Sequence, residues 1–87
     1  PHEWVNFRLT GRATAEPGDA SGSGWFDVHA RRYDLRALAS IEPRLTECLP
    51  ELIASDALAG ELTEDGARWL GLDSAAAGAA VSAGGGD

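Results

Sequence analysis

Large apolar side chains are sparse along this chain, and they occur in short groups separated by glycine and proline. Leu, Ile, Val and Phe together make up about 20% of the residues, and alanine supplies much of the remaining apolar content. Alanine buries little surface, and a chain of 87 residues buries only about 60–65% of its unfolded surface even when well packed. We therefore expect a piece of a larger protein whose apolar faces pack against parts outside it, rather than a free-standing domain.

The charge balance argues against two classes of partner. The chain has 14 acidic and 7 basic residues, all of the latter arginine, and its formal net charge is −7. Binding to nucleic-acid phosphates needs clustered Lys and Arg, and an anionic membrane surface repels an acidic chain. No apolar run approaches the about 20 residues of a membrane span. We expect neither a nucleic-acid partner nor a membrane partner.

The cysteine and histidine residues show no spacing typical of a metal or nucleophilic centre. Cys48 is the single cysteine, which excludes an internal disulfide and fits a reducing, cytoplasmic location. Its position beside Leu49 predicts a buried structural thiol. His2 and His29 are far apart in the sequence and lack neighbours at metal-ligand spacing. We expect no metal site in this chain.

The pattern of apolar residues predicts short helices and strands in alternation. Residues 1–10 have the spacing of the last turns of an amphipathic helix, in which Trp4 and Phe7 pack inward. Residues 11–24 are rich in Gly, Ser, Thr and Pro, which predicts a long loop. In residues 25–30 apolar and polar side chains alternate, which predicts a short strand.

The second half of the chain continues this alternation. Asp34 is placed to cap a helix that ends at Ile41, and residues 45–52 predict a further short helix bent near Pro50. Thr63 is placed to cap a helix that Gly71 terminates, and residues 79–83 predict a strand before the terminal glycines. The order of elements indicates an α/β fold.

Four stretches, taken in order, resemble one family. They read Leu9-Thr10-Gly11, then Gly18-Asp19-Ala20-Ser21-Gly22-Ser23 followed by Trp25-Phe26-Asp27-Val28, then Gly60-Glu61-Leu62-Thr63 with Leu70-Gly71-Leu72, and finally Val81 to Asp87. They are similar to the L-T-G, T-D-A-S-G-T, G-x-L-T…L-G-L and V-x-x-G-G-G-D motifs of the FGGY carbohydrate kinases. The triple glycine favours the xylulokinase branch, whereas Gly18 and Ser23 stand where the family usually has Thr.

This resemblance implies a fold, a reaction and its cofactors. The fold is that of an actin-like, ribonuclease-H-like ATPase domain, and residues 1–87 correspond to part of its N-terminal, sugar-binding domain. The implied reaction transfers the γ-phosphate of ATP to a hydroxyl of D-xylulose, giving xylulose 5-phosphate, with ATP and Mg²⁺ bound by parts outside this chain. By itself the chain is expected to be inactive. Two alternatives stay open: a family member acting on ribulose, gluconate or glycerol, and a small non-catalytic acidic interaction module.

Asp87 is the candidate catalytic residue, and it is also the expected contact to the sugar. As general base it would take the proton of the attacking hydroxyl, and the glycines before it let a substrate approach closely. Residues 84–86 lack the Lys of a phosphate-binding loop, so no nucleotide site is expected here. Asp19, Ser21 and Ser23 either bond to their own backbone or reach the substrate cleft, and the sequence leaves these two roles open.

Overall fold

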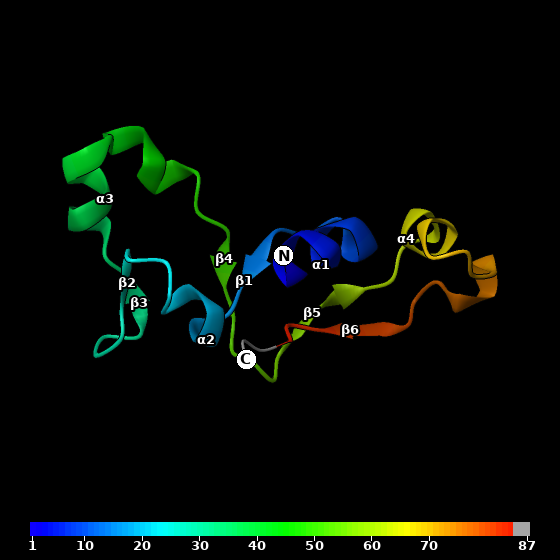
Figure 1. Cartoon of the computed structure of the whole chain (residues 1–87). Coiled ribbons are helices and arrows are strands. Elements are labelled where there is room, and N and C mark those ends of the chain that lie inside the picture. Colours follow the sequence, from blue (N-terminus) through cyan, green and yellow to red (C-terminus); the bar gives the residue numbers. More distant parts are fainter. Residues whose placement is uncertain (85–87) are drawn as a thin grey trace.

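Short helices and strands alternate along the chain in the computed structural model, which describes residues 1–84 (Figure 1). The helices are α1 (His2–Thr10), α2 (Pro17–Ala20), α3 (Leu35–Ile41) and α4 (Glu64–Trp69), with the 3-10 helices η1 (Pro43–Glu47) and η2 (Ser74–Ala76). The strands are β1 (Thr14–Ala15), β2 (Phe26–Asp27), β3 (Arg32–Tyr33), β4 (Glu51–Leu52), β5 (Leu58–Glu61) and β6 (Ala80–Ser82). The predicted α/β class is confirmed.

Within residues 1–84 the strands form three two-stranded pairs. β1 and β4 are parallel, with Thr14 opposite Glu51. The other two pairs are antiparallel: β2 with β3, and β5 with β6, where the register is interrupted between Leu58 and Gly60. Strands this short, in pairs this small, do not form a stable sheet on their own.

The helix caps are the residues that the sequence predicts. The Asp34 carboxylate accepts a hydrogen bond from the Ala37 amide at 3.0 Å, and the Thr63 hydroxyl accepts one from the Gly66 amide at 2.9 Å. Both side chains satisfy amides that the first helical turn leaves free. α1 ends at Gly11, whose φ of 74° is left-handed and therefore suits glycine. These predicted helix boundaries are confirmed.

Three predicted segments differ from the structure. The expected loop over residues 11–24 contains β1 and α2, and the expected helix over residues 45–52 is η1 followed by β4. β5 was not predicted, and the strand expected over residues 25–30 is only two residues long. β1, β4 and β5 form by pairing with segments far along the chain, which local sequence pattern does not reveal, whereas β2 pairs with the nearby β3.

The buried apolar residues are mostly alanine, as the composition indicates: Ala15, Ala20, Leu38, Ala59, Leu62, Ala67 and Ala83. The larger apolar side chains lie outside this thin core. Trp4 is 58% exposed and Phe7 is 46% exposed, and Cys48 is exposed as well. The predictions that these three side chains pack inside are therefore wrong for residues 1–84, because the thin, alanine-rich core does not extend over them.

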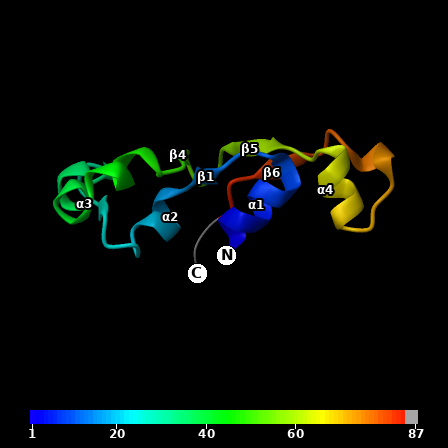
Figure 2. The same cartoon turned by 90° about the horizontal axis from the view of Figure 1, so that it is seen from above.

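The molecule is elongated, with α3 and α4 at opposite ends and α1 between them (Figures 1 and 2). Its radius of gyration is 14.6 Å, and its extents are 46 × 24 × 17 Å. A compact chain of this length would have a radius of gyration of about 12 Å. No helix among the described residues has the length and apolar character needed to cross a bilayer.

Candidate active site

The end of β6 is held against the first turns of α1. The side-chain amide of Asn6 donates to the carbonyl oxygens of Ser82 at 3.1 Å and Ala83 at 3.0 Å. Gly84 follows with a φ of 83°, and a Cβ added there would lie 3.4 Å from Cδ2 of His2. The backbone therefore leaves β6 directly beside the N-terminal turn of α1. Asp87, the predicted catalytic base, lies outside the described residues.

A buried carboxylate shapes the neighbouring turn. Glu16 is only 1% exposed, and it accepts hydrogen bonds from the Gly18 amide at 2.8 Å, the Asp19 amide at 2.6 Å and the Ser55 hydroxyl. Burial alone would raise the pKa of Glu16, but the hydrogen bonds from Ser55, Asp19 and Gly18 outweigh it and lower the pKa. Glu16 therefore stays ionised and fixes the start of α2, the helix that carries Asp19.

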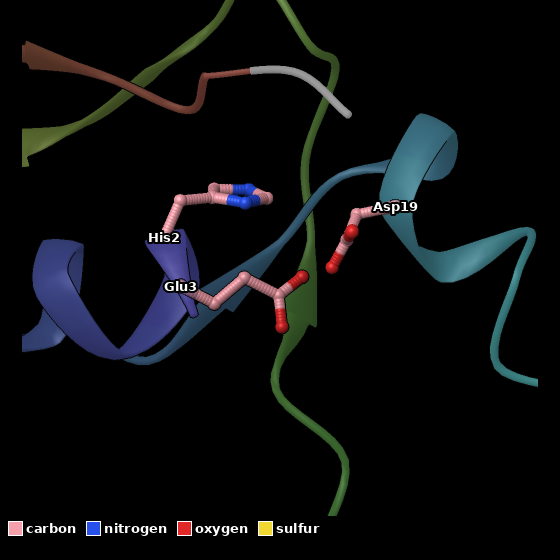
Figure 3. Close-up of side chains that lie close together, drawn as sticks. All are labelled: His2, Glu3 and Asp19. Atoms are coloured by element: carbon pink, nitrogen blue, oxygen red, sulfur yellow. The ribbon is translucent and has the colours of Figure 1, made fainter. Parts of the chain in front are cut away.

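The polar residues of this turn divide into two groups. The Ser21 hydroxyl donates to the Gly18 carbonyl at 2.7 Å, and the Ser23 hydroxyl donates to the Ala20 carbonyl at 2.6 Å. Both serines thus bond to their own backbone, which is the structural role the sequence had left open. The carboxylate of Asp19 instead points toward the first turn of α1 (Figure 3).

Asp19 meets His2 and Glu3 at this place. One side-chain donor atom from each residue lies within 4.8 Å of the others, and the three side chains converge in Figure 3. Burial and the nearby charge of Asp19 raise the pKa of Glu3. Nε2 of His2 is buried and has no hydrogen-bond partner within residues 1–84. We call these three residues the His2–Glu3–Asp19 cluster.

Sequence reasoning missed this cluster. Asp19 is 16 residues away from Glu3, and only the packing of α1 against the turn before α2 brings the two carboxylates together. No spacing rule along the chain connects residues on two separate elements. The nearest sequence signal was the resemblance motif around Asp19, which does not indicate His2 or Glu3.

A pocket of about 310 Å³ opens beside the cluster. Its lining combines the two carboxylates with apolar and aromatic side chains, among them Glu3, Asp19, Trp25, Tyr33, Leu38 and Leu45. This volume lies at the lower end of the range of small-molecule sites. The two carboxylates can accept hydrogen bonds from a ligand, whereas most of the remaining lining is apolar.

Known proteins resemble this chain over its whole length. The sequence model described as "FGGY family of carbohydrate kinases, N-terminal domain" matches residues 1–87. The chain is 37% identical to the xylulose kinase of Haemophilus influenzae, over all of this chain and 17% of that protein. It is 35% identical to the xylulose kinase of Staphylococcus xylosus, over 85% of this chain and 15% of that protein. The chain thus spans less than a fifth of the length of these relatives.

Solved structures agree with the sequence relatives. The xylulose kinase of Brucella ovis superposes with a TM-score of 0.79 at 28% identity, covering 98% of this chain and 17% of that one. The ligand-bound xylulose kinase of Lactobacillus acidophilus gives a TM-score of 0.78 at 23% identity, covering 95% of this chain and 16% of that one. This second likeness concerns the fold alone. The chain therefore belongs to the FGGY family of carbohydrate kinases and matches part of its N-terminal domain, which has an actin-like ATPase fold.

Proposed function

We propose that this chain is part of a sugar kinase that transfers the γ-phosphate of ATP to D-xylulose, giving xylulose 5-phosphate. The observation that carries the proposal is the 37% identity, over the whole chain, to the xylulose kinase of Haemophilus influenzae. A cytoplasmic location is part of the proposal, since the single cysteine suits a reducing compartment.

The exposed apolar side chains favour a kinase segment over a self-contained acidic module. Trp4, Phe7, Trp69, Leu70 and Leu72 are all exposed in the described residues. Trp4 and Trp69 meet edge to face with ring centroids 5.7 Å apart, and Arg8 lies over the Trp69 ring. A module that functions alone would bury such residues. We infer that the remainder of a longer kinase chain covers them.

Asp87 is the proposed general base and sugar contact. Transfer of a phosphoryl group to a hydroxyl requires that the hydroxyl proton be removed as the oxygen attacks. Asp87 follows Gly84 by three residues, and Gly84 is held beside the His2–Glu3–Asp19 cluster. Ligands of open α/β sheets bind beyond the carboxyl ends of strands, which is the position of Gly84 relative to β6.

Residues 1–84 do not fit ATP or its Mg²⁺. The chain contains no lysine, and its terminal glycines lack the spacing of a phosphate-binding loop. The proposal therefore assigns the nucleotide and its metal to the rest of the kinase, and no step is attributed to them here. It follows that residues 1–87 alone should not phosphorylate a sugar.

The test compares Asp87→Asn with the parent enzyme in the complete kinase chain. We expect kcat to fall about 10²- to 10⁴-fold, because the hydroxyl loses its proton acceptor. Glu47→Gln is the control, since Glu47 is exposed and lies in η1, which is not part of the site. Full turnover by Asp87→Asn would refute the assignment of the base.

The substrate requires its own measurement. The kinase should be assayed with D-xylulose, L-xylulose, ribulose, gluconate and glycerol, because one relative at 34% identity, from Pasteurella multocida, is named a probable L-xylulose kinase. We expect D-xylulose to give the highest kcat/KM. A higher value for any of the others would replace the proposed substrate and keep the family.

A further inference from the structure

The His2–Glu3–Asp19 cluster combines donors that metal ions favour. One imidazole and two carboxylates come from two elements, and their donor atoms lie within 4.8 Å of one another (Figure 3). Nitrogen and oxygen donors of this kind are typical ligands of zinc in proteins. Three protein ligands leave one position open for water or another ligand.

Within residues 1–84 no arginine forms an ion pair with the two carboxylates of the cluster. The ion pairs found within residues 1–84 lie elsewhere and join Arg12 with Glu51, Arg44 with Glu42, and Arg68 with Asp65. Among the residues that the structure describes, the basic side chain at the cluster is the imidazole of His2, and its buried Nε2 has no hydrogen-bond partner there. Buried polar atoms almost always have a partner, so this one points to a group that completes the site.

We propose that His2, Glu3 and Asp19 bind one divalent transition-metal ion of the zinc type. The imidazole favours such an ion over Mg²⁺ or Ca²⁺, which prefer oxygen ligands alone. Zn²⁺ bonds of about 2.0–2.1 Å place tetrahedral ligands about 3.3 Å apart, so the donors must approach one another by rotation of their side chains. Asp19 is exposed and free to make this adjustment.

The surrounding structure keeps the three residues together. The three hydrogen bonds to Glu16 fix the turn that carries Asp19, and Asn6 fastens β6 to the helix that carries His2 and Glu3. A bound ion would therefore join α1 to α2 beside the end of β6. This inference goes beyond the proposed kinase reaction and does not depend on it.

The test measures Zn²⁺ binding to the complete kinase chain, without nucleotide or sugar, by competition with a chromophoric chelator. We expect one tightly bound equivalent, and an affinity at least about tenfold weaker in both His2→Gln and Asp19→Asn. Loss of an indirect supporting residue already costs about 10- to 100-fold, so a direct ligand should cost no less. His29→Gln is the matched control, because His29 is exposed and outside the cluster.

A second readout uses the unaltered protein, so that a variant that fails to fold cannot obscure the result. Nuclear magnetic resonance of the imidazole nitrogens should show that one nitrogen of His2 shifts on addition of Zn²⁺, while those of His29 stay unchanged. Three results would overturn the proposal: absence of a stoichiometric site, a Zn²⁺ affinity in both His2→Gln and Asp19→Asn equal to that of the parent protein, or an unshifted His2. Zinc binding in a protein without kinase turnover would refute only the proposed kinase function.

Discussion

Replacement of Glu16 by Gln should loosen the turn that carries Asp19. The ionised carboxylate accepts three hydrogen bonds, from Gly18, Asp19 and Ser55, and it is 1% exposed. A glutamine keeps one acceptor oxygen but turns an N–H group toward at least one of these donors. Hydrogen bonds to charged groups contribute about 1.5–3 kcal/mol each, so we expect the free energy of local opening to fall by about 2–3 kcal/mol.

Hydrogen exchange of the amides in residues 17–22 measures this opening directly in the complete kinase chain. A loss of 2–3 kcal/mol corresponds to exchange that is faster by about 30- to 150-fold, since about 1.4 kcal/mol changes an equilibrium tenfold. Glu47→Gln is the matched control, because Glu47 is exposed and its substitution should change little.

The effect should depend on pH in a defined direction. Hydrogen bonding lowers the pKa of folded Glu16 below its unfolded value of about 4.3, so its contribution is complete above that pH. The contribution is lost as pH falls through the lower, folded pKa. The difference between the parent protein and Glu16→Gln should therefore be large near neutral pH and shrink below about pH 4. A constant difference across this range, or none at pH 7, would refute the reasoning.

Two further predictions concern packing near the ends of the chain. Gly66→Ala should lower the free energy of unfolding in urea by about 1–3 kcal/mol, because the added Cβ would lie 2.4 Å from a backbone oxygen of α1. Gly22→Ala is the control and should change this free energy little, since the nearest atom to its added Cβ is 3.6 Å away. Asn6→Ala should lower the free energy of unfolding by about 1–3 kcal/mol, since it removes both hydrogen bonds to the end of β6. Asn6→Asp should lower it further, because its carboxylate would face the same carbonyl oxygens. Equal stability of Asn6→Ala and the parent would contradict this.

The sequence predicted those parts of the fold that depend on local contacts. Asp34 and Thr63 cap helices because their side chains bond to amides three residues ahead, and Gly11 ends α1 because it adopts a left-handed conformation. Such interactions lie within a few residues of one another. Sequence patterns therefore located α1, α3 and α4 correctly, apart from small differences at their ends.

Elements formed by distant contacts could not be predicted in this way. β5 reads Leu-Ala-Gly-Glu, which has little strand propensity, and it forms because β6 pairs with it about 20 residues later. α2 begins at a glutamate cap that requires Ser55, 39 residues away, to complete its hydrogen bonds. The same limit applies to the site: Asp87 was predicted from family resemblance and stays a prediction, whereas the meeting of Glu3 with Asp19 depends on tertiary packing.

The contact between Asn6 and the end of β6 has a consequence for how the chain folds during synthesis. Asn6 and Ala83 are 77 positions apart, so α1 cannot reach its native partner until almost the whole segment has left the ribosome. At about 5–20 residues per second this takes about 4–15 s, far longer than a helix needs to form. During that interval the side-chain amide of Asn6 lacks its two carbonyl acceptors in β6, so the docking of α1 on this strand is among the last contacts of the segment to form.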